Sequence, residues 1–220
     1  MEPLNPANRR ILKTRSRVWP SAIARTLASA GITPNQVSVA SIVFAFGAGC
    51  AFWEAGEHLG ASTSLWLVAA AAAIQLRLLC NLLDGLLAIE GGLKSKTGDL
   101  YNEIPDRIAD ILILLGAGVA IHELTDWGIA LGVAAAMLAL LTAYIRLLGG
   151  SLGLPQDFRG PMAKQHRMFT LTAGSLAAAI EHAIRGTLWT LVAAMIVIVL
   201  GCVVTLALRT YRIARGLQAR

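Results

Sequence analysis

Long apolar runs are the feature that most limits what this chain of 220 residues can fold into. A helix needs about 20 mostly apolar residues to cross the hydrocarbon core of a bilayer, and six stretches approach or exceed that length. With 56% hydrophobic and 15% charged residues, the composition is typical of a polytopic membrane protein and excludes an ordinary soluble domain. The predicted spans are 36–56, 63–89, 103–122, 127–148, 168–184 and 187–208.

Lysine and arginine gather in alternate connections between these runs. They precede the first span and follow the second, fourth and sixth, whereas the connections at 57–62, 122–126 and 184–187 contain one cation, Arg185. Cationic loops are retained in the cytoplasm. The pattern therefore predicts a multi-pass protein of a bacterial-type inner (plasma) membrane with both termini in the cytoplasm.

The basic N-terminal segment predicts an amphipathic helix over residues 7–30. Its apolar side holds Ile11, Val18, Ile23 and Leu27, and arginines lie opposite, which is typical of a helix in the membrane interface. The net charge of +6 is explained by cytoplasmic retention and attraction to anionic lipid headgroups, so no nucleic-acid partner is expected.

The expected fold class is therefore an all-α polytopic membrane protein with six transmembrane helices and an N-terminal amphipathic interfacial helix. We divide the chain into a basic amphipathic segment at 1–33, a six-helix transmembrane domain at 34–209 and a basic cytoplasmic tail at 210–220.

An acidic stretch connects the second span to the third: CNLLDGLLAIEGGLKSKTGDLYNEIPDRIAD at 80–110. Helical spacing places Asn81 and Asp84 on one stripe, and Asn102, Asp106 and Asp110 on another. The connection is short, so we expect the two helices to be adjacent and antiparallel, with the stripes facing each other at the cytoplasmic boundary. Carboxylates that face one another beside lipid need a cation between them. Asp and Asn oxygens suit Mg²⁺, Mn²⁺ or Ca²⁺, and the arrangement indicates a metal that neutralises a phosphate.

This stretch resembles the signature of the CDP-alcohol phosphotransferases, which reads Asp, two residues, Asp-Gly, two residues, Ala-Arg, eight residues, Gly, three residues, Asp, three residues, Asp. All the gaps agree. Two carboxylates are replaced by Asn81 and Asn102, and the arginine is replaced by Ile89. The positions that keep the family's residue are Asp84, Gly85, Ala88, Gly98 and Asp106.

The resemblance implies a role for each matched position. Asp106 would be the catalytic base that deprotonates the acceptor hydroxyl, and Gly85, Ala88 and Gly98 would leave room for the cytidine diphosphate moiety. The ligands of Mg²⁺ or Mn²⁺ would be Asn81, Asp84, Asn102 and Asp106.

The implied reaction is transfer of a phosphatidyl or other phosphoalcohol group from a CDP-linked donor to a hydroxyl acceptor, with release of CMP. Many relatives of this kind are homodimers. A second cluster would bind the acceptor and consists of Arg146, inside the apolar run TAYIRLLGG, with Lys164 and Arg167. These cations favour an anionic acceptor.

The replaced carboxylates leave alternatives open. Four carboxylates can hold two divalent ions, but two carboxylates and two amides should hold the second ion weakly, unless Asp99, Glu103 or Asp110 compensates. The site then works with one metal or altered ligands, or the chain is a non-catalytic relative that binds lipid or nucleotide. An intramembrane prenyltransferase would share Asn-x-x-x-Asp-x-x-x-Asp but needs a second Asp-rich motif, and a transporter would show an inverted repeat.

Structural interpretations compete with ligation at several of these residues. Asn102 could cap the third helix, and Glu103 could pair with Arg107 one turn away. Asp84 and Asp106 are harder to explain in this way, because neither has a basic residue three or four positions away on its own helix.

Overall fold

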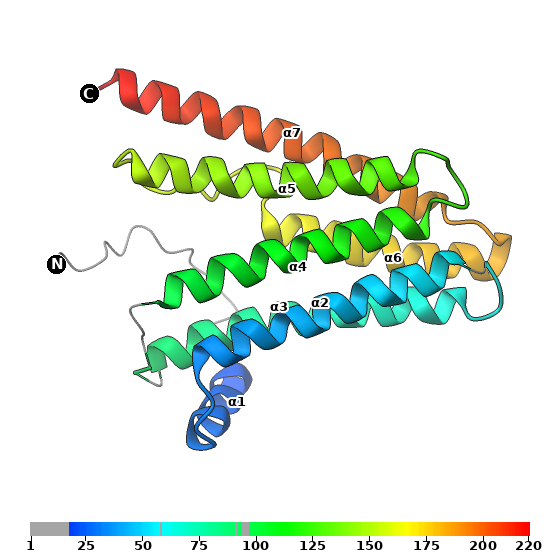
Figure 1. Ribbon diagram of the computed structural model, residues 1–220, viewed down its shortest axis with the longest axis horizontal. Coiled ribbons are helices and arrows are strands. Elements are labelled where there is room, and N and C mark those ends of the chain that lie inside the picture. The colour runs from blue at the N-terminus through cyan, green and yellow to red at the C-terminus, as the bar shows by residue number, and fades with distance from the viewer. Residues whose placement is uncertain (1–17, 58, 91, 94–96) are drawn as a thin grey trace.

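The computed structural model describes residues 18–57, 59–90, 92–93 and 97–220, which form seven helices and a set of short connections (Figure 1). The helices are α1 Val18–Ser29, α2 Pro34–Glu57, α3 Thr63–Glu90, α4 Gly98–Ala120, α5 Gly128–Ser151, α6 Lys164–Arg185 and α7 Trp189–Gln218. Each of the six predicted spans coincides with one helix from α2 to α7, and α7 continues as helix into the predicted tail.

Four of the described helices, α2, α3, α5 and α7, are long and apolar enough to cross a membrane by length and composition. Large apolar side chains on the outside of the bundle are exposed, for example Val43, Leu65 and Leu200. The chain is therefore an integral membrane protein, because an outer surface of this kind is stable against lipid and not against water.

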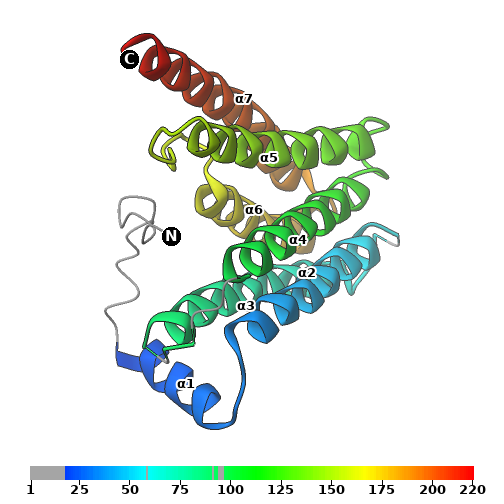
Figure 2. The same cartoon turned by 60° about the vertical axis from the view of Figure 1, so that its left-hand side comes forward.

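The long helices form a closed ring in which each helix packs against two neighbours. The order around the ring is α2, α3, α6, α7, α5, α4 and back to α2, and the helices run along a common axis in two views (Figures 1 and 2). α1 packs on α3 and lies across the end of the bundle at which α7 also ends. Consecutive helices α3 and α4 are thus not neighbours in the ring.

The polar stripes of α3 and α4 face each other as predicted, since Asn81 donates to Asp106 across them. Their backbones do not pack closely, because α2 draws each of them onto a surface of small residues. α2 packs closely on both, and a methyl group added at Gly116 of α4 would lie 2.7 Å from the Cα of Gly49. Gly118 and Gly132 bring α4 and α5 together in the same way. Small residues permit such close contact between membrane helices, whereas polar side chains lie between α3 and α4.

Local sequence signals explain where α1 and α2 lie. Thr33 accepts a hydrogen bond from the backbone N–H of Gln36, whose side chain accepts one from the backbone N–H of Thr33, and Pro34 begins α2. This is a capping box with proline in the first turn. In α1, Ala24 and Leu27 pack against α3, while the predicted apolar residue Ile23 is exposed and is free to enter lipid.

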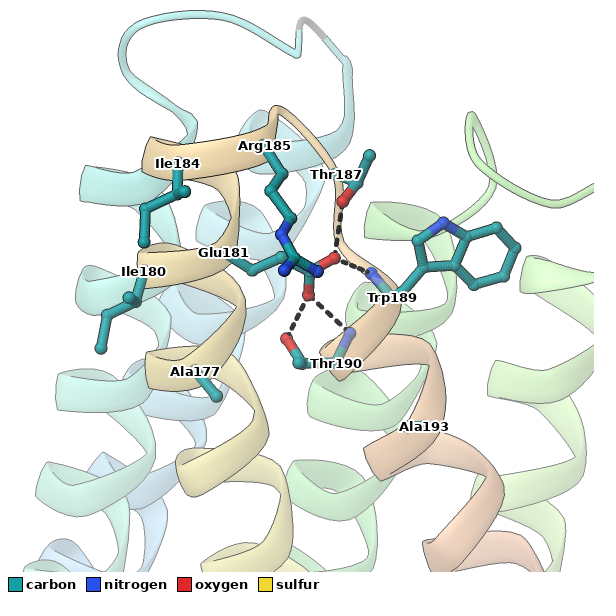
Figure 3. A pocket seen from close by; sticks show the side chains of 9 residues that line it. All are labelled: Ala177, Ile180, Glu181, Ile184, Arg185, Thr187, Trp189, Thr190 and Ala193. Atoms are coloured by element: carbon teal, nitrogen blue, oxygen red, sulfur yellow. Dashed lines mark hydrogen bonds between the residues drawn. The ribbon is translucent and has the colours of Figure 1, made fainter.

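Glu181, a charge near the end of the fifth predicted span, has a structural role at the end of the bundle opposite α1. Its carboxylate accepts hydrogen bonds from the hydroxyl of Thr187, the backbone N–H of Trp189 and both the N–H and hydroxyl of Thr190 (Figure 3). These N–H groups begin α7, so Glu181 supplies acceptors for donors that no helix can satisfy internally. The shallow pocket beside it is lined largely by apolar side chains of α6 and α7.

The glycine contact between α2 and α4 gives a stability prediction. Gly116→Ala forces a methyl group against the backbone of Gly49, 2.7 Å from its Cα, and we expect it to lower the free energy of unfolding by about 1–3 kcal/mol. Gly47→Ala is the matched control, since nothing lies within 4 Å of its added methyl group. Thermal unfolding in detergent measures both, and equal melting temperatures for the two variants would contradict the packing.

Candidate functional site

Asp106 of α4 is the centre of a polar cluster between α3, α4 and α6. One carboxylate oxygen accepts hydrogen bonds from the amide nitrogen of Asn81 at 3.0 Å and from the guanidinium of Arg77 at 3.3 Å. The other carboxylate oxygen accepts a hydrogen bond from the ammonium of Lys164. Asp106 is 5% exposed, so these donors from two other helices supply the partners that a buried carboxylate requires.

Asp110 lies one turn further along α4 and joins the same three helices. Arg77 of α3 donates to one of its oxygens at 2.9 Å, and Arg167 of α6 donates to the other at 2.6 Å. Arg77, Asp110 and Arg167 are all buried. Asp110 is therefore committed to two guanidinium groups, which excludes it as a replacement ligand for the missing carboxylates.

The other motif residues lie around this cluster. Asp84 is buried on α3 and accepts a 2.6 Å hydrogen bond from the hydroxyl of Ser38 on α2, and it is within electrostatic range of Lys164 and Asp106. Asn102 is exposed and lies inside the first turns of α4. It is therefore not the N-cap of this helix, a position that Thr97 occupies.

A cavity of about 1340 Å³ opens beside Asp106. Its size exceeds that of common small-molecule sites, about 300–1,000 Å³. α3, α4, α5, α6 and α7 all contribute to it, together with Trp19 of α1. Its charged and amide lining residues are Gln75, Asn81, Asn102, Glu103, Asp106, Arg107, Arg146, Lys164, Gln165, Arg167 and Arg209.

The three predicted acceptor-binding cations all line this cavity, but they already have partners. Arg146 donates to both carboxylate oxygens of Glu103, at 2.6 and 2.7 Å, and its guanidinium lies 5.0 Å from the ring centre of Phe158. Glu103 is also 3.7 Å from Arg107, the pair expected from helical spacing. Five cations line the cavity and only two carboxylates, Glu103 and Asp106. This excess of positive charge favours an anionic occupant.

Gly85, Ala88 and Gly98 have a different environment. Gly85 and Ala88 are half-buried on the last turns of α3, and Gly98 is the half-buried first residue of α4. None of the three lines the cavity described above.

The connection between α5 and α6 is held firmly against α7, and this positions Lys164. The backbone N–H of Met162 donates to the hydroxyl of Thr205, and the guanidinium of Arg209 donates to the carbonyl of Arg159. Burial raises the pKa of Asp157, but hydrogen bonds from Arg159 and Arg212 outweigh it and lower the pKa to about 2. α6 then begins at Lys164, well inside the bundle (Figure 1).

Sequence reasoning did not predict Ser38, and it considered Arg77 only as a structural partner of Asn81 rather than as a partner of Asp106. The signal for Arg77 was present, because a cation inside the apolar run AIQLRLLCN needs a buried partner. Local spacing could not reveal that partner, since the residues that pair with Asp106 and Asp84 lie on other helices.

The donor set of the cluster fits one divalent ion better than two. Asp84, Asp106 and the amide oxygens of Asn81 and Asn102 are hard oxygen ligands of the kind that Mg²⁺ and Mn²⁺ prefer. Within the described residues, however, no group of three or more His, Cys, Asp or Glu is arranged to hold a metal. Both oxygens of Asp106 already accept hydrogen bonds, so a second ion lacks a free carboxylate.

Comparison with known proteins identifies relatives of one kind. No family model matches the chain. It is 25% identical over 195 residues to a phosphatidylinositol phosphate synthase of Mycobacteroides abscessus, an alignment that covers 87% of this chain and 81% of the relative. It is 32% identical over 107 residues to an archaetidylinositol phosphate synthase of Pyrococcus horikoshii, where it spans about half of each chain, 49% and 50%.

Solved structures show the same fold. The phosphatidylinositol phosphate synthase of Mycobacterium tuberculosis with CDP-DAG bound matches with a TM-score of 0.74 and 21% identity, over 88% of this chain and 92% of that one. The same enzyme in complex with manganese and citrate matches with the same score and identity, over 88% of both chains.

The position of Asp110 between two buried guanidinium groups gives a second stability prediction. Asp110→Ala leaves Arg77 and Arg167 without their shared carboxylate, and we expect a loss of about 3–5 kcal/mol in the free energy of unfolding. Asp126→Asn, at an exposed aspartate of the α4–α5 connection, should change it by less than about 0.5 kcal/mol. Denaturant unfolding in detergent compares them, and a mild effect of Asp110→Ala would show that the triad does not join the helices.

Proposed function

We propose that this chain is a member of the CDP-alcohol phosphotransferase family, and that it transfers a phosphatidyl or related phosphoalcohol group from a CDP-linked donor to a hydroxyl acceptor and releases CMP. The observation that carries this proposal is the position of Asp106. Its buried carboxylate lies on the wall of a large cavity in which cations predominate. A base beside bound phosphate is the arrangement that phosphoryl transfer to a hydroxyl requires.

The proposed step balances without a further reactant. The acceptor oxygen forms a bond to the phosphorus that carries the diacylglycerol or other alcohol. The bond from that phosphorus to the oxygen bridging to CMP breaks, and its electron pair leaves with CMP. Asp106 takes the hydroxyl proton, while Arg77 and Asn81 hold its carboxylate in position through hydrogen bonds to one oxygen.

We propose Mg²⁺ or Mn²⁺ as the cofactor, held by Asp84 and Asp106 with support from Asn81 and Asn102. When bound, a divalent ion neutralises phosphate charge as it develops on the leaving group. A relative of this fold has been solved with manganese, and the oxygen donors of this chain agree with such an ion.

The acceptor is proposed to be a phosphorylated polyol. Arg146, Lys164 and Arg167 line the cavity, and arginine fits phosphate oxygens with two parallel hydrogen bonds. Arg146 is the best placed of the three, because its partner Glu103 is itself part of the cavity wall and can be exchanged for a phosphate. The named relatives are synthases of inositol phosphate lipids, which agrees with an anionic acceptor.

For the membrane arrangement, we propose six spans with α1 in the interface, both termini in the cytoplasm of a bacterial-type inner membrane, and a homodimer. Outward apolar stripes support α4 and α6 as spans, despite their charges. They are formed by Leu100, Ile104 and Ile108 on α4 and by Phe169, Leu176, Ile180 and Ile184 on α6, all exposed. The alternation of cationic connections supports the orientation.

Turnover of the purified protein with labelled CDP-diacylglycerol and an inositol phosphate acceptor tests the function. Asp106→Asn keeps the size of the side chain but cannot take the proton, so CMP release should fall by about 10²- to 10⁴-fold. The control is Asp126→Asn, remote from the cavity, which should retain full turnover. CMP release that is unchanged in Asp106→Asn would exclude its role as the base.

Metal binding gives a separate prediction. Asp84→Ala removes one of the two carboxylates at the matched positions, so calorimetry should show loss of Mn²⁺ binding as well as of turnover. Ser38→Ala removes only the hydrogen bond to Asp84 and should weaken Mn²⁺ binding by about tenfold, the usual effect of losing a group that orients a ligand. Mn²⁺ binding that survives Asp84→Ala would place the ion elsewhere.

A further inference from the structure

We propose that the ammonium group of Lys164 takes the place of a second divalent ion, so that this chain binds one Mg²⁺ or Mn²⁺ where four carboxylates would bind two. The inference deepens the proposed function and rests on it. It concerns how the chain balances the charge of its own carboxylates, and it is carried by the contacts of Asp106, the two asparagines and the position of Lys164 in the fold.

Lys164 makes its contact at Asp106, one of the two carboxylates proposed to hold the ion. Its ammonium lies against one oxygen of Asp106, and its charge also acts on Asp84. These are the two motif positions that keep a carboxylate. A positive charge close to both carboxylates offsets their mutual repulsion, and here Lys164 provides it from within the chain.

Asn81 agrees with a site that lacks a second ion. Its amide nitrogen donates to the other oxygen of Asp106 at 3.0 Å. A carboxylate at this position would instead face Asp106 and need a shared cation to overcome the repulsion. The amide removes one negative charge and converts a repulsive pair into a hydrogen bond, which lowers the demand for metal charge at this point.

Lys164 is also in a position where a cation is otherwise unfavourable. It is the first residue of α6, whose first turn contains no acidic residue, and the positive end of the helix dipole disfavours an ammonium there. The connection before it is anchored to α7 through Met162 and Thr205, so the backbone of Lys164 is fixed beside α4. The contact with Asp106 offsets the unfavourable position.

The charges of the side chains and of the donor diphosphate also favour a single divalent ion. The cluster has three carboxylates, Asp84, Asp106 and Asp110, and four cations, Arg77, Arg107, Lys164 and Arg167. It therefore carries no net negative charge that would call for a metal before the donor binds. The diphosphate of a CDP-linked donor carries one negative charge on each phosphate, so one divalent ion balances it. A second ion would leave excess positive charge in a buried site, which is costly.

The test counts Mn²⁺ ions in the full-length protein by calorimetry and by electron paramagnetic resonance, in which two neighbouring Mn²⁺ ions give a spin-coupled signal and a single ion does not. Wild type should bind one Mn²⁺. Lys164→Met should bind that ion at least about tenfold more tightly, because a unit positive charge close to the ion is removed. The triple variant Asn81→Asp, Asn102→Asp, Lys164→Met should bind two coupled ions, whereas Asn81→Asp, Asn102→Asp with Lys164 intact should still bind one.

Two controls separate charge at this site from charge in general. Lys164→Arg keeps the positive charge and should bind one Mn²⁺, as wild type does. Arg159→Met removes a cation from the same connection, where its side chain is 74% exposed and pairs with Asp157, and should leave both count and affinity unchanged. A wild-type count other than one, or a triple variant without the coupled signal, overturns the inference. Failure of the proposed function is distinguishable, because it appears as absent CMP release whatever the Mn²⁺ count.

Discussion

Burial of charge inside an apolar bundle is the constraint on which the rest of this structure depends. A carboxylate that lacks a partner there is strongly destabilising, and Asp110 meets this requirement through Arg77 and Arg167. The two guanidinium groups come from α3 and α6, so the pairing fixes three helices relative to one another. Asp106, the proposed base, lies one turn away on the same face of α4 and takes its orientation from this arrangement.

The packing of small residues creates the room that the site needs. α2 approaches α4 closely at Gly49 and Gly116, and it packs on α3 along its length. α3 and α4 are consequently held side by side with α2 without packing tightly on each other, and polar side chains fill the space between them. The cavity beside Asp106 is thus a product of where the glycines lie as much as of the charged residues that line it.

The cations of the cavity serve structure and chemistry together. Arg77 and Arg167 are buried and both donate to Asp110, whereas Arg146 and Lys164 pair with carboxylates on the cavity wall. The second kind can exchange a carboxylate for a phosphate or a metal ligand with little rearrangement. The site has two fewer carboxylates than the family motif. It nevertheless keeps Lys164 beside Asp106 and retains cations that can attract phosphate.

The sequence by itself determined the helical class, the positions of α2 to α7 along the chain and the motif that joins α3 to α4, because apolar length and helical spacing are local properties. It did not predict that α4 begins at Gly98 or that α7 extends to Gln218. The named relatives agree with the family that the motif predicted, and the solved structures share the fold. Only the tertiary structure decided what surrounds the motif. The order of helices in the ring, the partners Arg77 and Lys164 for Asp106, and Ser38 for Asp84 join residues far apart in the chain. Such pairings follow from which helix faces which, and no local spacing encodes that.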